Sequence, residues 1–283
     1  MGHAGAIGDA GAVEDAARTV RDPDGLAALD VRITDCAACP RLVAWREETA
    51  RVKRPAHRDQ EYWARPVPGF GPPDAALLLV GLAPAAHGAN RTGRMFTGDR
   101  SGDVLYAALH ALGLASAPHT EAADDGLALR GVRITSPVHC APPANRPSPG
   151  ERDTCRPWLV RELELLRPTL RSVVVLGAFG WQALWPALAA AGFAVPRPRP
   201  AFGHGTRVGV GSRPAGPEPG RTAGGPGPTV FGCYHVSQRN TFTGRLTPAM
   251  LRRVLATAAG AAGVLPARDA PGDVSPGAPP PSP

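Results

Sequence analysis

Three short segments of this sequence gather polar side chains that could hold a flat heterocycle and a phosphate. The first, residues 81–103, combines five glycines with one aromatic ring, Phe96. Glycine lets a backbone approach a ligand closely, and the ring offers a flat face for stacking. The second segment ends at Asn145, whose amide both donates and accepts hydrogen bonds and therefore suits the edge of a planar base. The third begins at His235 and continues with the polar residues 237–240, which suit a phosphate.

Four of the five cysteines could form a metal site. Cys36 and Cys39 form a C-x-x-C pair, Cys140 lies in the second polar segment, and Cys155 follows after a short loop. A pair with this spacing binds one metal or one edge of a cluster, and two further thiolates complete a four-sulfur site. The spacing leaves zinc and a [4Fe-4S] cluster open, and ordinary buried thiols are the alternative. Cys233 lies inside an apolar run and is expected to be a small core residue.

A parallel sheet must position these segments. Four apolar runs bounded by glycine or proline are predicted strands: residues 76–82, 132–138, 172–176 and 229–235. Continuous apolar runs are typical of strands buried on both faces. The helices predicted between and after them are residues 102–112, 151–166, 179–191 and 248–262. The alternation predicts an α/β fold in three layers, with a four-stranded parallel sheet. The polar segments follow strands, where such folds bind ligands.

Length and composition set the limits of the folded part. The chain has 283 residues, of which 43% are hydrophobic, enough for one domain with a sizeable core. Glycine and proline concentrate in a predicted disordered leader (1–28), a flexible insertion (196–228) and a proline-rich tail (265–283), which leaves a domain over 29–264. No apolar run has the length of a membrane span, and the first 25 residues lack a secretory signal. We therefore expect a cytoplasmic protein without a membrane partner.

The charge balance favours an anionic partner. Lysine and arginine number 31 against 24 aspartates and glutamates, and Lys53 is the one lysine among them. Arginine binds phosphate through a planar, permanently charged fork, so a nucleic acid fits this composition. Codon bias in a GC-rich genome is the alternative explanation of the arginine excess.

Together these motifs resemble those of the family 5, or type b, uracil-DNA glycosylases. The resemblance extends from about residue 34 to residue 255 and is carried by residues 81–103, 140–145 and 235–245, with the four-cysteine pattern in agreement. It implies one α/β/α domain with a short, mainly parallel sheet, and a [4Fe-4S] cluster rather than zinc. From the cysteine pattern, we expect the cluster to have a structural role. The resemblance also implies a DNA-repair hydrolase that excises uracil, and other deaminated bases, from DNA and leaves an abasic site. We expect this enzyme to be a monomer.

The resemblance also assigns roles to the residues of the three segments. A glycosylase must flip its nucleotide out of the base stack into a pocket. Phe96 matches the ring that stacks on the flipped base, and Asn145 matches the amide that reads the Watson–Crick edge of that base. His235 matches the histidine that hydrogen-bonds a base carbonyl, where negative charge develops on the leaving ring.

The turn after the first predicted strand departs from other glycosylases of the superfamily. Backbone amides of Gly81, Leu82 and Ala83 are expected to contact the base. Ala83 stands where relatives carry an acidic residue that positions water, and its methyl group has no such chemistry. The resemblance gives that task to Asp99, since a carboxylate near the sugar stabilises an oxocarbenium-like transition state and orients water. From the residues alone, Asp99 is equally well explained as a helix cap.

The third segment is expected to contact DNA outside the pocket. Arg239, Asn240 and Arg245 are the predicted DNA-binding residues, and the alternative for Asn240 is a turn-fixing role. Leu246 resembles a residue that wedges into the duplex, although it could also be a hydrophobic staple of the following helix. Two other functions are compatible with the motifs: a non-catalytic protein that binds damaged DNA and holds an iron-sulfur cluster or zinc, and an enzyme that acts on a free nucleoside.

Overall fold

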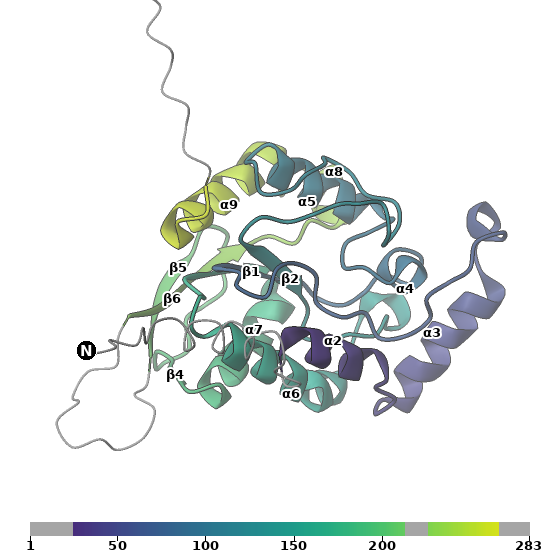
Figure 1. Cartoon of the computed structure of the whole chain (residues 1–283), viewed down its shortest axis with the longest axis horizontal. Helices are drawn as coiled ribbons and strands as arrows, with labels where there is room; N and C mark the ends of the chain where they lie inside the picture. Colours follow the sequence, from purple (N-terminus) through teal and green to yellow (C-terminus); the bar gives the residue numbers. More distant parts are fainter. Residues whose placement is uncertain (1–24, 213–225, 266–283) are drawn as a thin grey trace, which may run out of the picture.

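A central sheet separates two layers of helices in the protein, whose computed structural model describes residues 25–212 and 226–265 (Figure 1). The helices on one face are α5 (Arg100–His110) and α9 (Pro248–Ala262). Those on the other face are α2 (Leu26–Thr34), α6 (Pro149–Leu166) and α7 (Ala178–Ala190). This arrangement confirms the predicted three-layer α/β/α fold.

The described residues form a sheet of six strands in the order β2-β1-β3-β6-β5-β4. Four of them are parallel and match the predicted strands: β1 (Leu77–Val80), β2 (Val132–Thr135), β3 (Ser172–Leu176) and β6 (Pro226–Cys233). Val80 at the end of β1 is in register with Thr135 and Val175. The segments that follow these strands therefore leave the sheet at the same edge.

Two antiparallel strands correct the predicted count of four. They are β4 (Phe193–Ala194) and β5 (Arg207–Ser212), and β5 pairs with β6. The predicted insertion at 196–228 is therefore partly ordered sheet, whereas residues 213–225 lie outside the described part. Glycines weaken the strand signal of β5, and its backbone pairing with β6 supplies what local propensity lacks.

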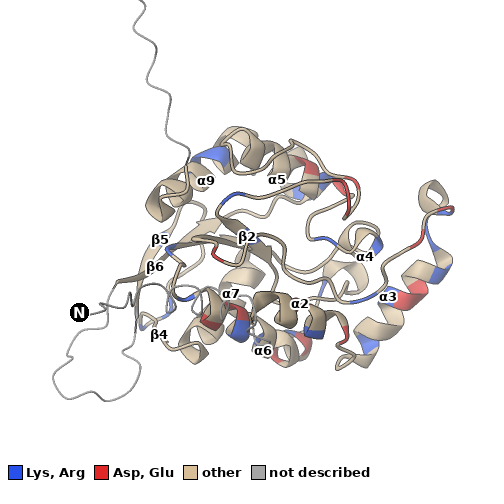
Figure 2. Ribbon diagram, viewed as in Figure 1, with Lys and Arg blue, Asp and Glu red and all other residues tan. Residues whose placement is uncertain are grey.

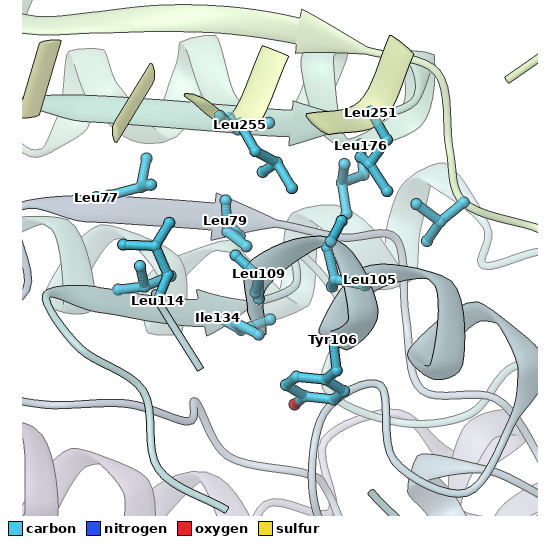
Figure 3. Close-up of a cluster of buried hydrophobic side chains, with 14 of the residues drawn as sticks. Leu77, Leu79, Leu105, Tyr106, Leu109, Leu114, Ile134, Leu176, Leu251 and Leu255 are labelled. Carbon is cyan, nitrogen blue, oxygen red and sulfur yellow. The ribbon is translucent and has the colours of Figure 1, made fainter. Parts of the chain in front are cut away.

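Alternation along the strands divides the core between the two faces. Leu77 and Leu79 point to the side of α5 and α9, whereas Leu78 and Val80 pack against α6 and α7. All four side chains are fully buried. Figure 3 shows the first of these clusters, in which leucines of the strands meet leucines of α5 and α9. Burial on both faces explains why these strands are continuous apolar runs.

Among the described residues, six helices lie outside the ranges predicted as helical from the sequence. Helix α2 begins at Leu26, so ordered structure starts inside the predicted leader 1–28, of which residues 1–24 lie outside the described part. The remaining helices are α3 (Pro40–Val52), η1 (Pro55–His57), α4 (Ala89–Thr92), η2 (Pro143–Asn145) and α8 (Gln238–Phe242).

Within the described ranges, no helix is both long and apolar enough to cross a bilayer.

Candidate active site

A pocket of about 260 Å³ opens at the carboxyl-end edge of the parallel strands. It brings together six of the residues singled out in the sequence: Leu82, Ala83, Phe96, Asp99, Asn145 and His235. Six further lining residues have no role assigned from the sequence: Pro84, Ala85, Ala89, Met95, Ser101 and Ser136, whereas Ser237 belongs to the third polar segment. Most of these are small or apolar, and the only signal that could have indicated them is their position inside the glycine-rich segment 81–103 or near the end of a predicted strand. The pocket is smaller than the roughly 300–1,000 Å³ typical of drug-sized ligands and suits a single small ring.

Phe96 lies directly over the backbone of Gly81. A Cβ atom at position 81 would come within 3.0 Å of two carbons of the Phe96 ring, so the missing side chain makes room for the ring. Phe96 itself has a φ of 54°, a left-handed conformation that is costly for an aromatic residue. The surrounding loop therefore holds the ring in a strained position at the pocket, as is typical of functional sites.

His235 follows β6 and faces Phe96 across the pocket. The two ring centroids are 6.3 Å apart, with an angle of 34° between the ring planes. Asn240 holds the loop, because its Nδ2 donates a hydrogen bond to the carbonyl oxygen of His235 at 2.8 Å. Burial lowers the pKa of His235 to about 4, since the charged imidazolium loses its hydration. The imidazole is therefore neutral at physiological pH and has one N–H to donate.

Asn145 reaches the pocket from the end of η2. Ala144 and Asn145 both have left-handed backbones, with φ values of 52° and 54°. Asparagine tolerates this conformation better than most residues, whereas alanine pays a steric cost. The residue is exposed apart from its contact with the pocket, so its amide is accessible to a ligand that enters from solvent.

Asp99 uses its two carboxylate oxygens differently. Oδ1 accepts hydrogen bonds from the backbone N–H groups of Ser101 and Gly102, at 2.8 and 3.1 Å, and so caps α5. The carboxylate also lines the pocket, beside Gly88. Desolvation raises the pKa of Asp99, and the two backbone hydrogen bonds oppose that effect. The capping role is therefore real, and it leaves the second oxygen available to a ligand.

The loop between β1 and α5 is held by side chains that do not line the pocket. Arg91 donates to the carbonyl oxygens of His87 and Gly98, at 2.9 and 3.0 Å, and thereby joins the two ends of the loop. Asn90 is fully buried and donates to the carbonyl oxygen of Arg46 at 3.3 Å, which ties the loop to α3. His87 forms a 3.0 Å hydrogen bond with the hydroxyl group of Tyr62. These contacts fix the loop rather than the ligand.

The predicted DNA-binding residues lie outside the pocket. Arg239 and Arg245 are exposed, and the guanidinium of Arg245 lies 4.7 Å from the ring centroid of Tyr234. Asn240 uses its amide within the loop, which agrees with the turn-fixing alternative. Leu246 is 1% exposed and packs in the core near α9, so the staple interpretation holds and the wedge interpretation does not.

The four cysteines Cys36, Cys39, Cys140 and Cys155 line one small cavity between α3, α6 and the segment after β2. They are neighbours around this cavity; among the described residues, no three His, Cys, Asp or Glu side chains converge closely enough to hold a single metal ion. Four sulfur donors around a shared space match the ligand chemistry of an iron-sulfur cluster. Cys233 is fully buried in the apolar core, as predicted.

Comparison with known proteins links this pocket to DNA repair. The family model described as "Uracil DNA glycosylase superfamily" matches residues 68–259, which include every predicted pocket residue. A type-5 uracil-DNA glycosylase of Mycobacterium bovis is 53% identical over 238 residues, covering 83% of this chain and 81% of the relative. The corresponding protein of Mycobacterium leprae is 51% identical over 236 residues (83% and 95%). That of Thermus thermophilus is 48% identical over 232 residues (82% and 96%).

Proposed function

Because the chain belongs to the uracil DNA glycosylase superfamily, we propose that it removes uracil from DNA by hydrolysing the N-glycosidic bond, an N-glycosyl hydrolase reaction. The bond between the sugar C1′ and the base nitrogen breaks, and its electron pair leaves with the base. The oxygen of a water molecule forms the new bond to C1′, and a proton from that water passes to the base or to solvent. The observation that carries this proposal is the convergence of Phe96, Asn145, His235 and Asp99 on one pocket.

The pocket contacts both the flat face and the hydrogen-bonding edge of the flipped uracil. The ring of Phe96 stacks on the base, and the missing side chain of Gly81 makes room for that ring. The amide of Asn145 donates to a uracil carbonyl and accepts from the adjacent ring N–H, a pattern that cytosine does not offer. The methyl group of Ala83 contributes an apolar wall without chemistry of its own.

His235 stabilises the leaving base. As the glycosidic bond breaks, negative charge accumulates on the uracil ring and its carbonyl oxygens. A fixed hydrogen-bond donor at that place lowers the energy of the transition state more than that of the ground state. The neutral imidazole can perform this task because one of its ring nitrogens carries an N–H that donates to the carbonyl oxygen.

Asp99 acts on the sugar side of the bond. A carboxylate close to C1′ stabilises the positive charge of an oxocarbenium-like sugar and accepts a hydrogen bond from the attacking water. The capping hydrogen bonds at Oδ1 hold the carboxylate in one orientation. The position of Asp99 beside the pocket supports this role. Its carboxylate would then perform the task for which Ala83 has no suitable group.

DNA binding is proposed to use the surface around the pocket mouth. Arg239 and Arg245 are exposed and follow the pocket residues His235 and Ser237 in the chain, and they are proposed to contact phosphates, which positions the duplex without reading its sequence. The proposed substrate is DNA that contains uracil, single- or double-stranded.

The four cysteines are proposed to hold a [4Fe-4S] cluster with a structural role. Cys36 and Cys39 come from the segment between α2 and α3, Cys140 follows β2, and Cys155 lies in α6. A group bound by all four would join three parts of the chain, in addition to the ion pair between Arg41 of α3 and Glu151 of α6. When bound, it supplies cross-linking of these segments and takes no part in the hydrolysis.

The experiment that tests the function uses the full chain and a labelled duplex with one uracil. We expect release of free uracil and an alkali-labile abasic site, with no product from a matched duplex that carries thymine. A protein that binds the uracil duplex without releasing a base would instead be a damage-binding module. Hydrolysis of free deoxyuridine with no reaction on DNA would identify a nucleoside hydrolase, and either outcome overturns the proposal.

A further inference from the structure

Buried arginines separate into two kinds in the part of the chain that the structure describes. Three arginines there are buried: Arg46, Arg94 and Arg133, with exposures of 6%, 5% and 2%. Arg94 forms an ion pair with Asp125 at 2.6 Å, and Arg133 forms ion pairs with two carboxylates. Among the described residues, no carboxylate oxygen lies within 4.0 Å of the guanidinium of Arg46. Arg46 is thus a buried cation without a carboxylate partner.

The guanidinium of Arg46 points at the four-cysteine cavity instead. Its Nη1 lies 3.1 Å from the Sγ atom of Cys140 and 3.3 Å from the carbonyl oxygen of Cys36. Its Nε is buried and has no hydrogen-bond partner. The side chain is therefore held beside the sulfur atoms with part of its donor capacity unused.

A buried guanidinium requires a compensating negative charge, because an unpaired cation loses its hydration without recovering the energy. Neutral thiols do not provide that charge, whereas thiolates do. Four thiolates carry more negative charge than an oxidised [4Fe-4S] core neutralises, so the bound assembly is a net dianion. Cys39, at the N-cap of α3, places the positive end of that helix toward the same cavity.

We propose that Arg46 is the counter-ion of the group held by the four cysteines, and that its hydrogen bond to Cys140 Sγ retains that group and tunes its redox potential. This inference rests on the cluster proposed above. Arg46 lies on α3, whose surface carries charges of both signs (Figure 2). It acts through Cys140 and does not touch the DNA pocket, so it is a positioning residue. A nearby positive charge stabilises the reduced cluster, which is the more negatively charged form, and it also opposes release of the cluster from the protein.

The test compares variants of the cluster-loaded full chain purified without oxygen. Arg46→Met removes the charge while keeping a long apolar stem, and Arg46→Lys restores the charge. Arg51→Met is the matched control, because Arg51 lies on the same helix, is exposed and pairs with Glu48. The readouts are iron and sulfide per chain, the rate at which visible absorbance is lost in a chelator, and the reduction potential of the loaded fraction.

We expect Arg46→Met to lose its cluster about 10- to 100-fold faster than the wild type, the usual effect of removing a partner of a metal ligand. Its potential moves to a more negative value, Arg46→Lys recovers most of both changes, and Arg51→Met matches the wild type. Failure of Arg46→Met to load, with normal loading of Arg46→Lys, also supports the proposal.

Two results would overturn the role of Arg46. Loss rates and potentials of Arg46→Met within twofold of the wild type would show that the charge is not needed. Equal damage from Arg46→Lys and Arg46→Met would show that shape, rather than charge, is what matters. Wild-type protein that contains no iron or sulfide would instead refute the cluster itself. The glycosylase assay separates that outcome from a failure of the proposed function.

Discussion

The carboxylate of Asp99 lies against the main chain of Gly88, in the space that a side chain at position 88 would occupy. A Cβ atom at that position would come within 2.9 Å of the Asp99 Cγ and 3.0 Å of its Cβ. The carboxylate has little freedom to retreat, because its Oδ1 is bound to the N-terminus of α5. Gly88 and the helix cap together fix where the free oxygen of Asp99 lies.

We therefore predict that Gly88→Ala displaces Asp99 and slows uracil excision about 10- to 100-fold, since a shift of about 1 Å at a reacting group has effects of this size. Single-turnover release of uracil measures the rate, and fluorescence anisotropy measures DNA affinity, which should change little. The control is Gly150→Ala in α6, where the nearest atom to an added Cβ is 3.9 Å away. Equal rates for Gly88→Ala and the wild type would contradict the proposed catalytic role of the Asp99 carboxylate.

Substitutions of Asp99 separate its capping role from its proposed catalytic role. Asp99→Asn keeps an oxygen for the cap and removes the charge, so the free energy of unfolding at pH 7 should stay the same or rise. Asp99→Ala loses the cap at a cost of about 1 kcal/mol. Uracil release should fall about 100-fold or more in both variants. Chemical denaturation and single-turnover kinetics give the two quantities, and full activity of Asp99→Asn would reduce Asp99 to a helix cap.

The low pKa of His235 predicts that the contribution of this residue to the rate of uracil release does not change with pH near neutrality. From pH 8 down to about pH 5 the imidazole stays neutral, so its contribution to the rate of uracil release is constant. The folded-state pKa of about 4 lies below the ordinary value of 6.5, so this residue costs stability as the pH falls from 6.5 toward 4. His235→Gln should abolish that stability loss and slow excision about 100- to 1,000-fold. An inflection near pH 6.5 that vanishes in His235→Gln would contradict the neutral imidazole.

Asn145 is predicted to provide recognition at a cost in backbone strain. Asn145→Ala and Asn145→Gly both remove the amide, and each should slow excision about 10- to 100-fold, as expected for the loss of a bidentate base contact. Glycine adopts the left-handed conformation freely, whereas alanine does not. Thermal unfolding should therefore rank Asn145→Gly at or above Asn145→Ala while their activities stay equal. Activity that follows stability instead would assign Asn145 a structural role.

The cysteine cavity predicts that Cys36→Ala lowers iron content and soluble yield together. Cys233→Ala is the matched control, because Cys233 is buried in the core away from that cavity. Iron analysis and the visible absorbance spectrum of both variants are the measurements. Normal iron content in Cys36→Ala would remove this residue from the proposed ligand set.

Much of the fold was predictable from the sequence because the buried strands are uninterrupted apolar runs. β3 and α9 begin and end where the pattern predicts. The antiparallel strand β5 escaped prediction because its two glycines and the glycine- and proline-rich sequence around it resemble a loop, and its partner β6 stabilises it through backbone pairing. Helix α2 escaped because it is short and lies next to a sequence rich in alanine and glycine.

Some residues of the site were predictable from the sequence, and the roles of others were decided by the structure. The residue types of Phe96, Asn145 and His235, and their places after strands, were sufficient to nominate them. The sequence did not distinguish the two explanations of Asp99, because a cap and a pocket carboxylate need the same residue type. It also left Leu246 open between a wedge and a staple, and burial decided in favour of the staple.

By itself, the sequence determined which chemical groups the protein has and which edge of the sheet they follow, because strand periodicity and turn residues are local properties. Tertiary structure alone decided how these groups meet. The close approach of Asp99 to Gly88, the ring of Phe96 over Gly81 and the guanidinium of Arg46 beside Cys140 each join segments whose distance is set by packing across the domain. Such distances depend on the whole core, which no local pattern encodes.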